Sequence, residues 1–387
     1  MDVRKLVNVE QVVKWRRHFH MYPEIAFKEY ETSNYIVKEL ASYPEIEVLR
    51  PTETSVVAVL KGAKPGKTVG LRADFDALPI EEEADVEFKS KNPGVMHSCG
   101  HDCHAAMLLG AVDVLYGLRN DLSGTVKFIF QHAEEVEPGG AKQIIETGVL
   151  DDVDAFYGSH VSGEDPAGVI LVASGPVYAN ADLFSIKLKG KGAHAARPDA
   201  SIDTLLVGTE VVQALNYIVS RNISSAERAV LTVGMFHAGT ADNIIPDTAA
   251  IGGTVRTYKP EIRDLMERRI SEVTEGICSA YGASCDVNYV RGYSAVINDN
   301  KLYTMVKEIA ADVLPDVNVK EMQPIMGGED FSAYGKIAPA FFSGIGAKPN
   351  TIEHYGHHHP KFTIDEASLP IGTTMYAAFV LRVLGGE

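Results

Sequence analysis

Two spacings of hydrophobic residues occur along this chain of 387 residues, and they predict which segments are helices and which are strands. Apolar residues recur at helical spacing within residues 9–41, with an interruption at 21–24, and again within 104–118. Short apolar runs bounded by turn-forming residues predict strands at 55–61, 68–72, 125–131 and 155–160. Strands that alternate with helices in this way are typical of an α/β protein with a mixed, largely parallel sheet flanked by helices.

The pattern changes between residues 180 and 293. A strand predicted at 183–189 alternates apolar and polar residues, as a half-exposed antiparallel strand does. A helix, two strands, a helix and a strand are predicted after it, at 202–219, 229–236, 248–256, 261–280 and 284–291. This β-α-β-β-α-β order is typical of a ferredoxin-like α+β domain. We therefore predict one domain made of residues 1–179 and 294–387, with a second domain, residues 180–293, inserted into it.

Length and charge restrict the possible partners of the chain. A chain of 387 residues is long for one hydrophobic core and fits two domains. The formal net charge of −16 argues against nucleic acid or an anionic membrane surface as a partner. No run of about 18 apolar residues is present, and the polar segment 1–17 lacks the apolar centre of a secretory signal. We therefore expect no membrane-spanning segment and a cytoplasmic location.

Side chains that bind transition metals are concentrated between Met96 and His104, where three His, two Cys and one Asp occur in nine residues. Cys99 and His101 are separated by one residue, a spacing that suits a loop around a metal ion. A thiolate and an imidazole favour a borderline-soft ion such as zinc, and manganese, cobalt and nickel remain alternatives. Asp102 stands where the N-cap of the following helix is expected.

Acidic residues and a histidine come directly after predicted strands. Asp74 and Asp76 follow one strand, Glu134 and Glu135 follow another, and His160 ends a third. In sheets of this kind ligands bind beyond the carboxyl ends of the strands, so we expect these residues to lie together. Adjacent residues of a strand point to opposite sides, so one glutamate is expected to bind a metal while the other acts as a general base.

Two further histidine-rich segments allow more than one interpretation. The triplet His357–His359 is compatible with part of a metal site or with exposed residues of a polar turn. The dense group of Arg and His residues at 16–20, followed by Pro23, is interpreted as the end of a surface helix before a proline turn.

These motifs together resemble the metal-dependent aminoacylase and carboxypeptidase family of amidohydrolases. The nearest branch contains hippurate hydrolases, auxin-conjugate hydrolases and N-acyl-amino-acid amidohydrolases. The resemblance covers essentially the whole chain, in the motifs at 16–24, 71–79, 96–104, 133–135, 158–160, 192–198, 243–247, 253–256, 327–331 and 358–362. It implies a zinc-exopeptidase-like catalytic domain with an inserted domain that serves as a lid and dimerisation surface.

The resemblance also implies a site that holds two divalent metal ions, zinc, manganese, cobalt or nickel. The implied ligands are Cys99, which bridges the two ions, and His101, Glu135, His160 and His358. By the same resemblance Glu134 is the catalytic base and Asp76 orients a ligand. His101 would replace a ligand histidine that many relatives carry at the position of Asp74, which leaves open whether Asp74 contacts metal.

On the inserted domain the resemblance implies three further site residues. His194 would reach the active site of a partner subunit and stabilise the oxyanion, which implies a homodimer or a higher homo-oligomer. Asn243 and Arg256 would contact the substrate, and an arginine suits a carboxylate.

Two positions depart from the family pattern. Cys103 stands where close relatives usually have a small residue, and a second thiol near metals would make the site sensitive to oxidation. Residues 136–140 differ from the glycine-rich loop of many relatives, which implies a different substrate pocket.

We therefore expect a metal-dependent amidohydrolase that acts on N-acyl amino acids or small dipeptide-like substrates. A deacetylase of N-acetyl-diaminopimelate and an aminopeptidase or dipeptidase are the alternatives within the family. A non-catalytic metal-binding scaffold is the alternative outside it, and it is disfavoured because every implied ligand is present.

Overall fold

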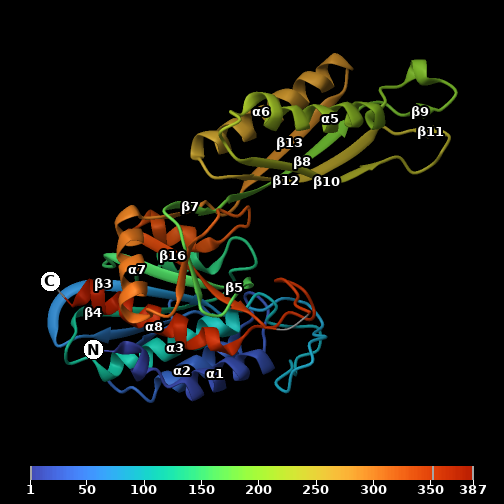
Figure 1. The fold of residues 1–387 in the computed structure, drawn as a ribbon. Coiled ribbons are helices and arrows are strands. Elements are labelled where there is room, and N and C mark those ends of the chain that lie inside the picture. Colours follow the sequence, from blue (N-terminus) through green and yellow to red (C-terminus); the bar gives the residue numbers. More distant parts are fainter. Residues whose placement is uncertain (1, 351–352, 386–387) are drawn as a thin grey trace. The chain divides into compact units, whose positions relative to one another are not determined.

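Two units make up the computed structural model, which describes residues 2–350 and 353–385 (Figure 1). The first unit consists of Met1–Val177, Val296–Gln323 and Asp330–Glu387, and the second of Tyr178–Ala295 and Pro324–Glu329. The loop Pro324–Glu329 thus groups with the second unit, whereas the sequence analysis placed it in the first. The lid and dimerisation roles assigned to the inserted domain stay predictions.

An eight-stranded sheet forms the centre of the first unit, in the order β1-β2-β4-β3-β5-β16-β6-β15. Its strands are β1 (Glu47–Leu49), β2 (Val56–Lys61), β3 (Lys64–Asp74), β4 (Ser123–Gln131), β5 (Ala155–Pro166), β6 (Val169–Val172), β15 (Asn318–Glu321) and β16 (Ala340–Lys348). The four central strands β4, β3, β5 and β16 are parallel, whereas β1, β2 and β6 join by antiparallel pairing. This mixed sheet, flanked by helices, confirms the predicted fold class.

Helices cover both faces of this sheet. They are α1 (Val9–Met21), α2 (Tyr30–Leu40), α3 (His101–Gly117), α4 (Gly140–Glu146), α7 (Asn300–Val313) and α8 (Leu369–Leu384). One large core joins α1, α2, α3, α7 and α8 to the sheet, in which α3 and α8 are buried along most of their length. On the other face α4 packs against a 3₁₀ helix at Asp330–Lys336, whose Phe331 packs against Phe342 of β16.

One helix bears on the expectation of no membrane-spanning segment. Within the described residues, the helix Glu366–Leu384 is long and apolar enough to cross a membrane by length and composition alone. However, 72% of its apolar window is buried inside the protein, and α8, its main part, packs against α3 and α7. Such burial is typical of a core helix.

Parallel pairing brings the predicted strand ends together. Asp74 at the end of β3 pairs with Gln131 at the end of β4, and Arg72 pairs with Gly158 of β5. The prediction that His160 ends its strand is wrong, because β5 continues to Pro166 through its pairing with β16.

The second unit is a four-stranded antiparallel sheet in the order β10-β12-β8-β13, with α5 and α6 on one face (Figure 1). Its elements are β8 (Asn180–Lys189), α5 (Thr204–Asn222), β10 (Ala229–Ala238), β12 (Thr248–Thr257), α6 (Pro260–Ala280) and β13 (Ser284–Arg291). The order of elements and of strands is that of a ferredoxin-like fold. A short antiparallel pair, β9 (Ala193–His194) and β11 (Ile244–Ile245), extends from one end (Figure 1). Two more short strands, β7 (Gly175–Tyr178) and β14 (Val296–Asn298), pair with each other and belong mainly to the first unit.

Candidate active site

The helix that follows the Cys/His-rich segment begins at His101, directly after Gly100. Gly100 has a left-handed backbone with φ +91°, and a Cβ atom there would lie 2.3 Å from Cγ2 of Val161. Glycine is required at this position because it tolerates both the backbone angle and the close approach of β5. The N-cap is therefore Gly100, and the prediction that Asp102 caps the helix is wrong, since Asp102 lies in the first turn.

Asp102 instead joins a buried network of charged groups. Its carboxylate lies 2.9 Å from Nε of Arg16 and 2.8 Å from Nδ1 of His20, whose Nε2 is 3.0 Å from Glu82. Burial alone would raise the pKa of Asp102, but the positive charge of Arg16 and the hydrogen bond and charge of His20 together outweigh burial and hold that pKa well below its usual range. Arg16 and His20 are each only 2% exposed, so the interpretation of this segment as a surface helix end is wrong. The network anchors α1 to the turn that carries His101.

His101 directs an unpaired nitrogen into the site. Its Nδ1 lies 3.0 Å from the backbone oxygen and 3.2 Å from Oδ1 of Asp76. Because both partners are acceptors, Nδ1 carries the proton, and the lone pair of Nε2 is available to a ligand. That Nε2 atom is buried and has no hydrogen-bond partner among the described residues. An acceptor left unsatisfied inside a protein indicates a missing electrophile such as a metal ion.

The five predicted metal ligands lie together in two groups that share one sulfur atom. Cys99, His101 and His160 form one group, and Cys99, Glu135 and His358 form the other. Within each group, one ligand atom from every residue lies within 4.8 Å of the others. Two ions bound by these groups would share Cys99, as the resemblance implied.

His160 presents the same kind of lone pair as His101. Its Nδ1 lies 2.7 Å from the carbonyl oxygen of Val161 and donates to it, which leaves Nε2 3.5 Å from Sγ of Cys99. His104 lies close by but has no such lone pair, because its Nε2 accepts the N–H of Val161 and its Nδ1 contacts Asp74. A histidine with both nitrogens in use is a supporting residue rather than a ligand.

Asp74 is held by neighbours on two sides. Arg72 of the same strand lies 2.6 Å from its Oδ2, and His104 contacts its Oδ1. Asp74 lies 3.9 Å from Nε2 of His101, and these three residues Asp74, His101 and His104 also form a cluster of possible donors. Its strong contacts to Arg72 and His104 make Asp74 a support for His104 in this arrangement.

The expectation that Glu134 and Glu135 point to opposite sides is wrong. They lie in a loop after β4, and Ala133 before them has a left-handed backbone with φ +49°. This turn directs both carboxylates towards the same atom. Oε2 of Glu134 and Oε1 of Glu135 each lie 4.0 Å from Nε2 of His101. The alternation of an extended strand does not apply here, because β4 ends at Gln131.

The histidine triplet is resolved by its hydrogen bonds. Nε2 of His357 accepts the N–H of Gly163, and Nδ1 of His359 accepts the N–H of Lys361. His358 has a left-handed backbone with φ +65°, and its Nε2 lies 3.2 Å from Glu135. The central histidine is therefore the one that faces the predicted site.

The donor set fits divalent ions of borderline softness. Burial and the negative charge of Glu135 raise the pKa of Cys99 to about 12, so these protein groups by themselves disfavour the thiolate. A cation would reverse this effect, because a coordinated thiol loses its proton. One thiolate, three imidazoles and a carboxylate suit zinc, manganese, cobalt or nickel better than magnesium or calcium.

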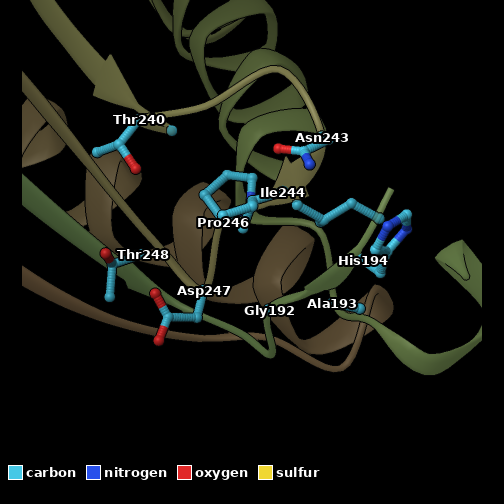
Figure 2. A pocket seen from close by; sticks show the side chains of 11 residues that line it. Gly192, Ala193, His194, Thr240, Asn243, Ile244, Pro246, Asp247 and Thr248 are labelled. Atoms are coloured by element: carbon cyan, nitrogen blue, oxygen red, sulfur yellow. The ribbon is translucent and has the colours of Figure 1, made fainter. Parts of the chain in front are cut away.

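Two of the three predicted site residues of the second unit line one pocket. His194 of β9 and Asn243 before β11 lie at one end of a cavity of about 650 Å³, and Asp247 and Thr248 lie at the other (Figure 2). Pairing of His194 with Ile244 brings these two segments together. Arg256 of β12 is not among the lining residues, and its Nη1 lies 3.1 Å from the backbone oxygen of Val255.

Sequence reasoning missed the residues that support the site. Glu29, His20 and His104 are buried polar residues that hold the loops and the helix end around the candidate ligands. A signal was present for His20 in the dense group of charged residues at 16–20. Glu29 had no signal, because a lone glutamate before an amphipathic helix is common at surfaces.

Comparison with known proteins gives a consistent result. Residues 70–382 match the peptidase family M20/M25/M40. The chain is 44% identical over 299 residues to an N-acyl-L-amino acid amidohydrolase of Geobacillus stearothermophilus, which covers 77% of this chain and 81% of that protein. It is 38% identical to thermostable carboxypeptidase 1 of Saccharolobus solfataricus, over 98% of this chain and 97% of the other. A solved Bacillus subtilis structure, described as a dinuclear metal-binding peptidase of the M20 family, superposes with a TM-score of 0.86 at 35% identity, covering 98% and 99% of the two chains.

Proposed function

The chain belongs to peptidase family M20/M25/M40, in which the relatives it matches are hydrolases of amide or peptide bonds, and on this premise we propose its reaction. The protein is a metal-dependent amidohydrolase that cleaves the amide bond of N-acyl amino acids or of small dipeptide-like substrates. The name of the Geobacillus stearothermophilus relative supports the N-acyl amino acid class.

One observation carries this proposal: two groups of metal donors share Cys99, and the carboxylate of Glu134 lies beside them. Cys99, His101, Glu135, His160 and His358 would hold two divalent ions of the zinc, manganese, cobalt or nickel type. His101 is held as a ligand by Asp76, which accepts the proton at Nδ1 and so keeps Nε2 directed into the site.

In the proposed reaction Glu134 acts first as general base and then as general acid. Its carboxylate takes a proton from the attacking water and returns that proton to the nitrogen of the leaving amine. The bound ions supply a lowered pKa for the water and polarisation of the substrate carbonyl. Burial of Glu134 at the edge of the core keeps its carboxylate out of bulk water.

The second unit contributes substrate contacts in this proposal. His194 stabilises the oxyanion by donating a hydrogen bond, and Asn243 and Arg256 contact the substrate, with Arg256 suited to a carboxylate. His194 is supplied by the other subunit of a homodimer. The dimer and the cytoplasmic location stay predictions.

The experiment is a substrate panel with a matched pair of variants. The protein, loaded separately with each of the four metals, is assayed on acetyl, benzoyl and indole-acetyl amino acids and on dipeptides. We expect hydrolysis of at least one N-acyl amino acid, and loss of turnover in Glu134→Gln while metal content stays at that of the wild type. Glu83→Gln, an exposed residue, is the control. Activity near wild type in Glu134→Gln would remove the base assignment, and hydrolysis of dipeptides alone would remove the N-acyl amino acids from the proposed substrate class.

A further inference from the structure

Glu29 is a fully buried carboxylate that the proposed reaction does not use. It lies directly before α2 and has two partners from other segments. Its Oε1 accepts the backbone N–H of Ala133 at 2.8 Å, and its Oε2 accepts the hydroxyl of Thr54 at 3.1 Å. Burial of a carboxylate is costly unless hydrogen bonds compensate for the lost water, and one of these bonds goes to the backbone of Ala133.

Ala133 is the residue that turns the chain towards the candidate metal centre. Its left-handed backbone is rare for a residue with a Cβ atom, and such backbones persist only where the surroundings hold them. Both of its backbone polar groups are held, the N–H by Glu29 and the carbonyl oxygen by the N–H of Gly140 at 3.1 Å. Glu134 is the next residue, so the direction of its carboxylate depends on this turn.

A second left-handed residue braces the same loop. Phe27 has φ +64°, at a position of its turn where glycine is preferred. The turn is closed by the N–H of Lys28, which donates to the carbonyl oxygen of Ile25 at 3.0 Å. The Phe27 ring packs edge-on against His132, with ring centres 5.6 Å apart. Residues 25–29 therefore contact His132 and Ala133, the two residues before Glu134.

The other end of the loop is held by a different carboxylate. Oδ2 of Asp76 accepts the N–H of Glu135 at 3.0 Å. Glu29 and Asp76 thus hold the two backbone N–H groups on either side of Glu134. Burial and the negative charge of Asp76 raise the pKa of Glu29 to about 7, because both disfavour the ionised form of this carboxyl. A residue kept against such a cost is a candidate for a functional role.

We propose that Glu29 is a positioning residue for Glu134, which it aims at the reacting water by holding the left-handed turn at Ala133. The inference rests on the proposed function, because it takes Glu134 as the general base. It assigns no contact between Glu29 and substrate or metal. Asp76 still holds the N–H of Glu135, the proposed ligand on the same loop, when Glu29 is replaced. The effect should therefore appear in kcat and leave the binding of substrate and metal unchanged.

Two substitutions of Glu29 separate the hydrogen bond from the charge. Glu29→Met has a similar volume but no acceptor, and we expect kcat to fall about 100-fold, with KM and metal content unchanged, because small misplacements of a catalytic group have effects of this size. Glu29→Gln keeps an acceptor for Ala133, so its kcat should stay within about threefold of wild type. Full kcat in Glu29→Met, or loss of metal from it, would overturn the proposal.

A rescue experiment tests the left-handed turn itself. Glycine adopts this backbone without a side-chain penalty, so Ala133→Gly in the Glu29→Met background should recover about tenfold of the lost kcat. In the wild-type background the same substitution should change kcat little. Absence of any recovery would show that Glu29 does not act through this turn.

Folding and function are kept apart by two further measurements. Glu29→Met leaves the hydroxyl of Thr54 without its partner. If Glu29→Met does not fold, the double variant with Thr54→Val removes this hydroxyl as well. Thr54→Val alone is the control, and its kcat should be unchanged. Hydrogen exchange of the peptide 132–136 gives a readout that needs no activity, and Glu29→Met should speed exchange there while distant peptides are unaffected. Unchanged exchange would overturn the inference even if the substrate panel identified no substrate. If the wild type is active, Glu134→Gln is inactive and Glu29→Met keeps the kcat of the wild type, the proposed function stands and only the inference about Glu29 is overturned.

Discussion

The sulfur atom of Cys99 lies 3.5 Å from Nε2 of His160, although 61 positions separate the two residues in the chain. Cys99 comes from the loop before α3, whereas His160 lies within β5. The same sulfur also belongs to the group formed with Glu135 and His358. The arrangement makes Cys99 the residue on which both proposed ions depend.

Removal of this shared sulfur should therefore affect both ions. We expect Cys99→Ala to retain at most one of two metal equivalents and to lose at least about 100-fold in activity, because each ion loses a ligand. Metal content after loading and desalting measures the first effect. Cys285→Ser, a thiol of the second unit, is the matched control and should bind metal as the wild type does. Two retained equivalents in Cys99→Ala would contradict the shared role.

Asp76 should tune metal affinity without being a ligand. It fixes the proton of His101 on Nδ1 and holds the N–H of Glu135. Loss of such a partner typically weakens metal binding about 10- to 100-fold, so we expect this decrease in Asp76→Ala. Competition with a chromogenic chelator measures the affinity. The exposed Asp85→Ala is the control, and equal affinities of the two variants would show that Asp76 has no such role.

The buried network at the start of α3 should matter for stability. Arg16 pairs with Asp102 and, at 3.3 Å, with Glu366, so Arg16→Met would leave buried carboxylate charge without its partner. We expect the free energy of unfolding to fall by about 3–5 kcal/mol in urea titrations of the metal-free protein. Arg4→Met removes an exposed pair with Asp316 and should cost less than about 1 kcal/mol. Similar losses in both variants would argue against the network.

The charge of Glu29 should give the protein a characteristic pH dependence. Its pKa is raised from 4.5 to about 7 on folding, by burial and by Asp76. The folded protein therefore binds this proton more tightly than the unfolded chain, and the resulting stability is present below pH 4.5 and is lost as the pH rises to about 7.

The side chain introduced by Glu29→Gln cannot ionise, so the variant does not lose this stability as the pH rises. We expect the free energy of unfolding of the variant, relative to that of the wild type, to rise by on the order of 2 kcal/mol between about pH 5 and pH 8. Urea unfolding of the metal-free proteins at both pH values measures the difference. A constant difference would mean that Glu29 titrates normally in the folded protein.

The proposed donation of His194 across a dimer has its own test. Glu134→Gln and His194→Ala chains should each be inactive as homodimers, and mixing them through unfolding and refolding should restore activity. If His194 acts on the partner subunit, a mixed dimer contains one site with both groups intact, so up to about a quarter of wild-type activity is expected from random pairing. No restored activity in a verified mixed dimer would favour donation within one chain.

Local pattern determined much of the architecture. The helices at Val9–Met21 and His101–Gly117 and the strand at Ser123–Gln131 agree with their predicted segments within a few residues. The order of elements in the second unit was equally readable, because hydrophobic spacing reports which face of an element is buried. The sequence also identified the candidate metal ligands, because each of them lies in a short motif that resembles the family.

Tertiary structure decided how these side chains are used. In the histidine triplet, His357 and His359 accept the N–H groups of Gly163 and Lys361, and His358 is left as the candidate metal ligand. Glu134 and Glu135 face the same way because Ala133 turns left-handed, and Glu29 from a distant segment accepts its N–H. No local spacing predicts such contacts, because the free energy that holds an unfavourable backbone or a buried charge comes from residues brought near by the fold.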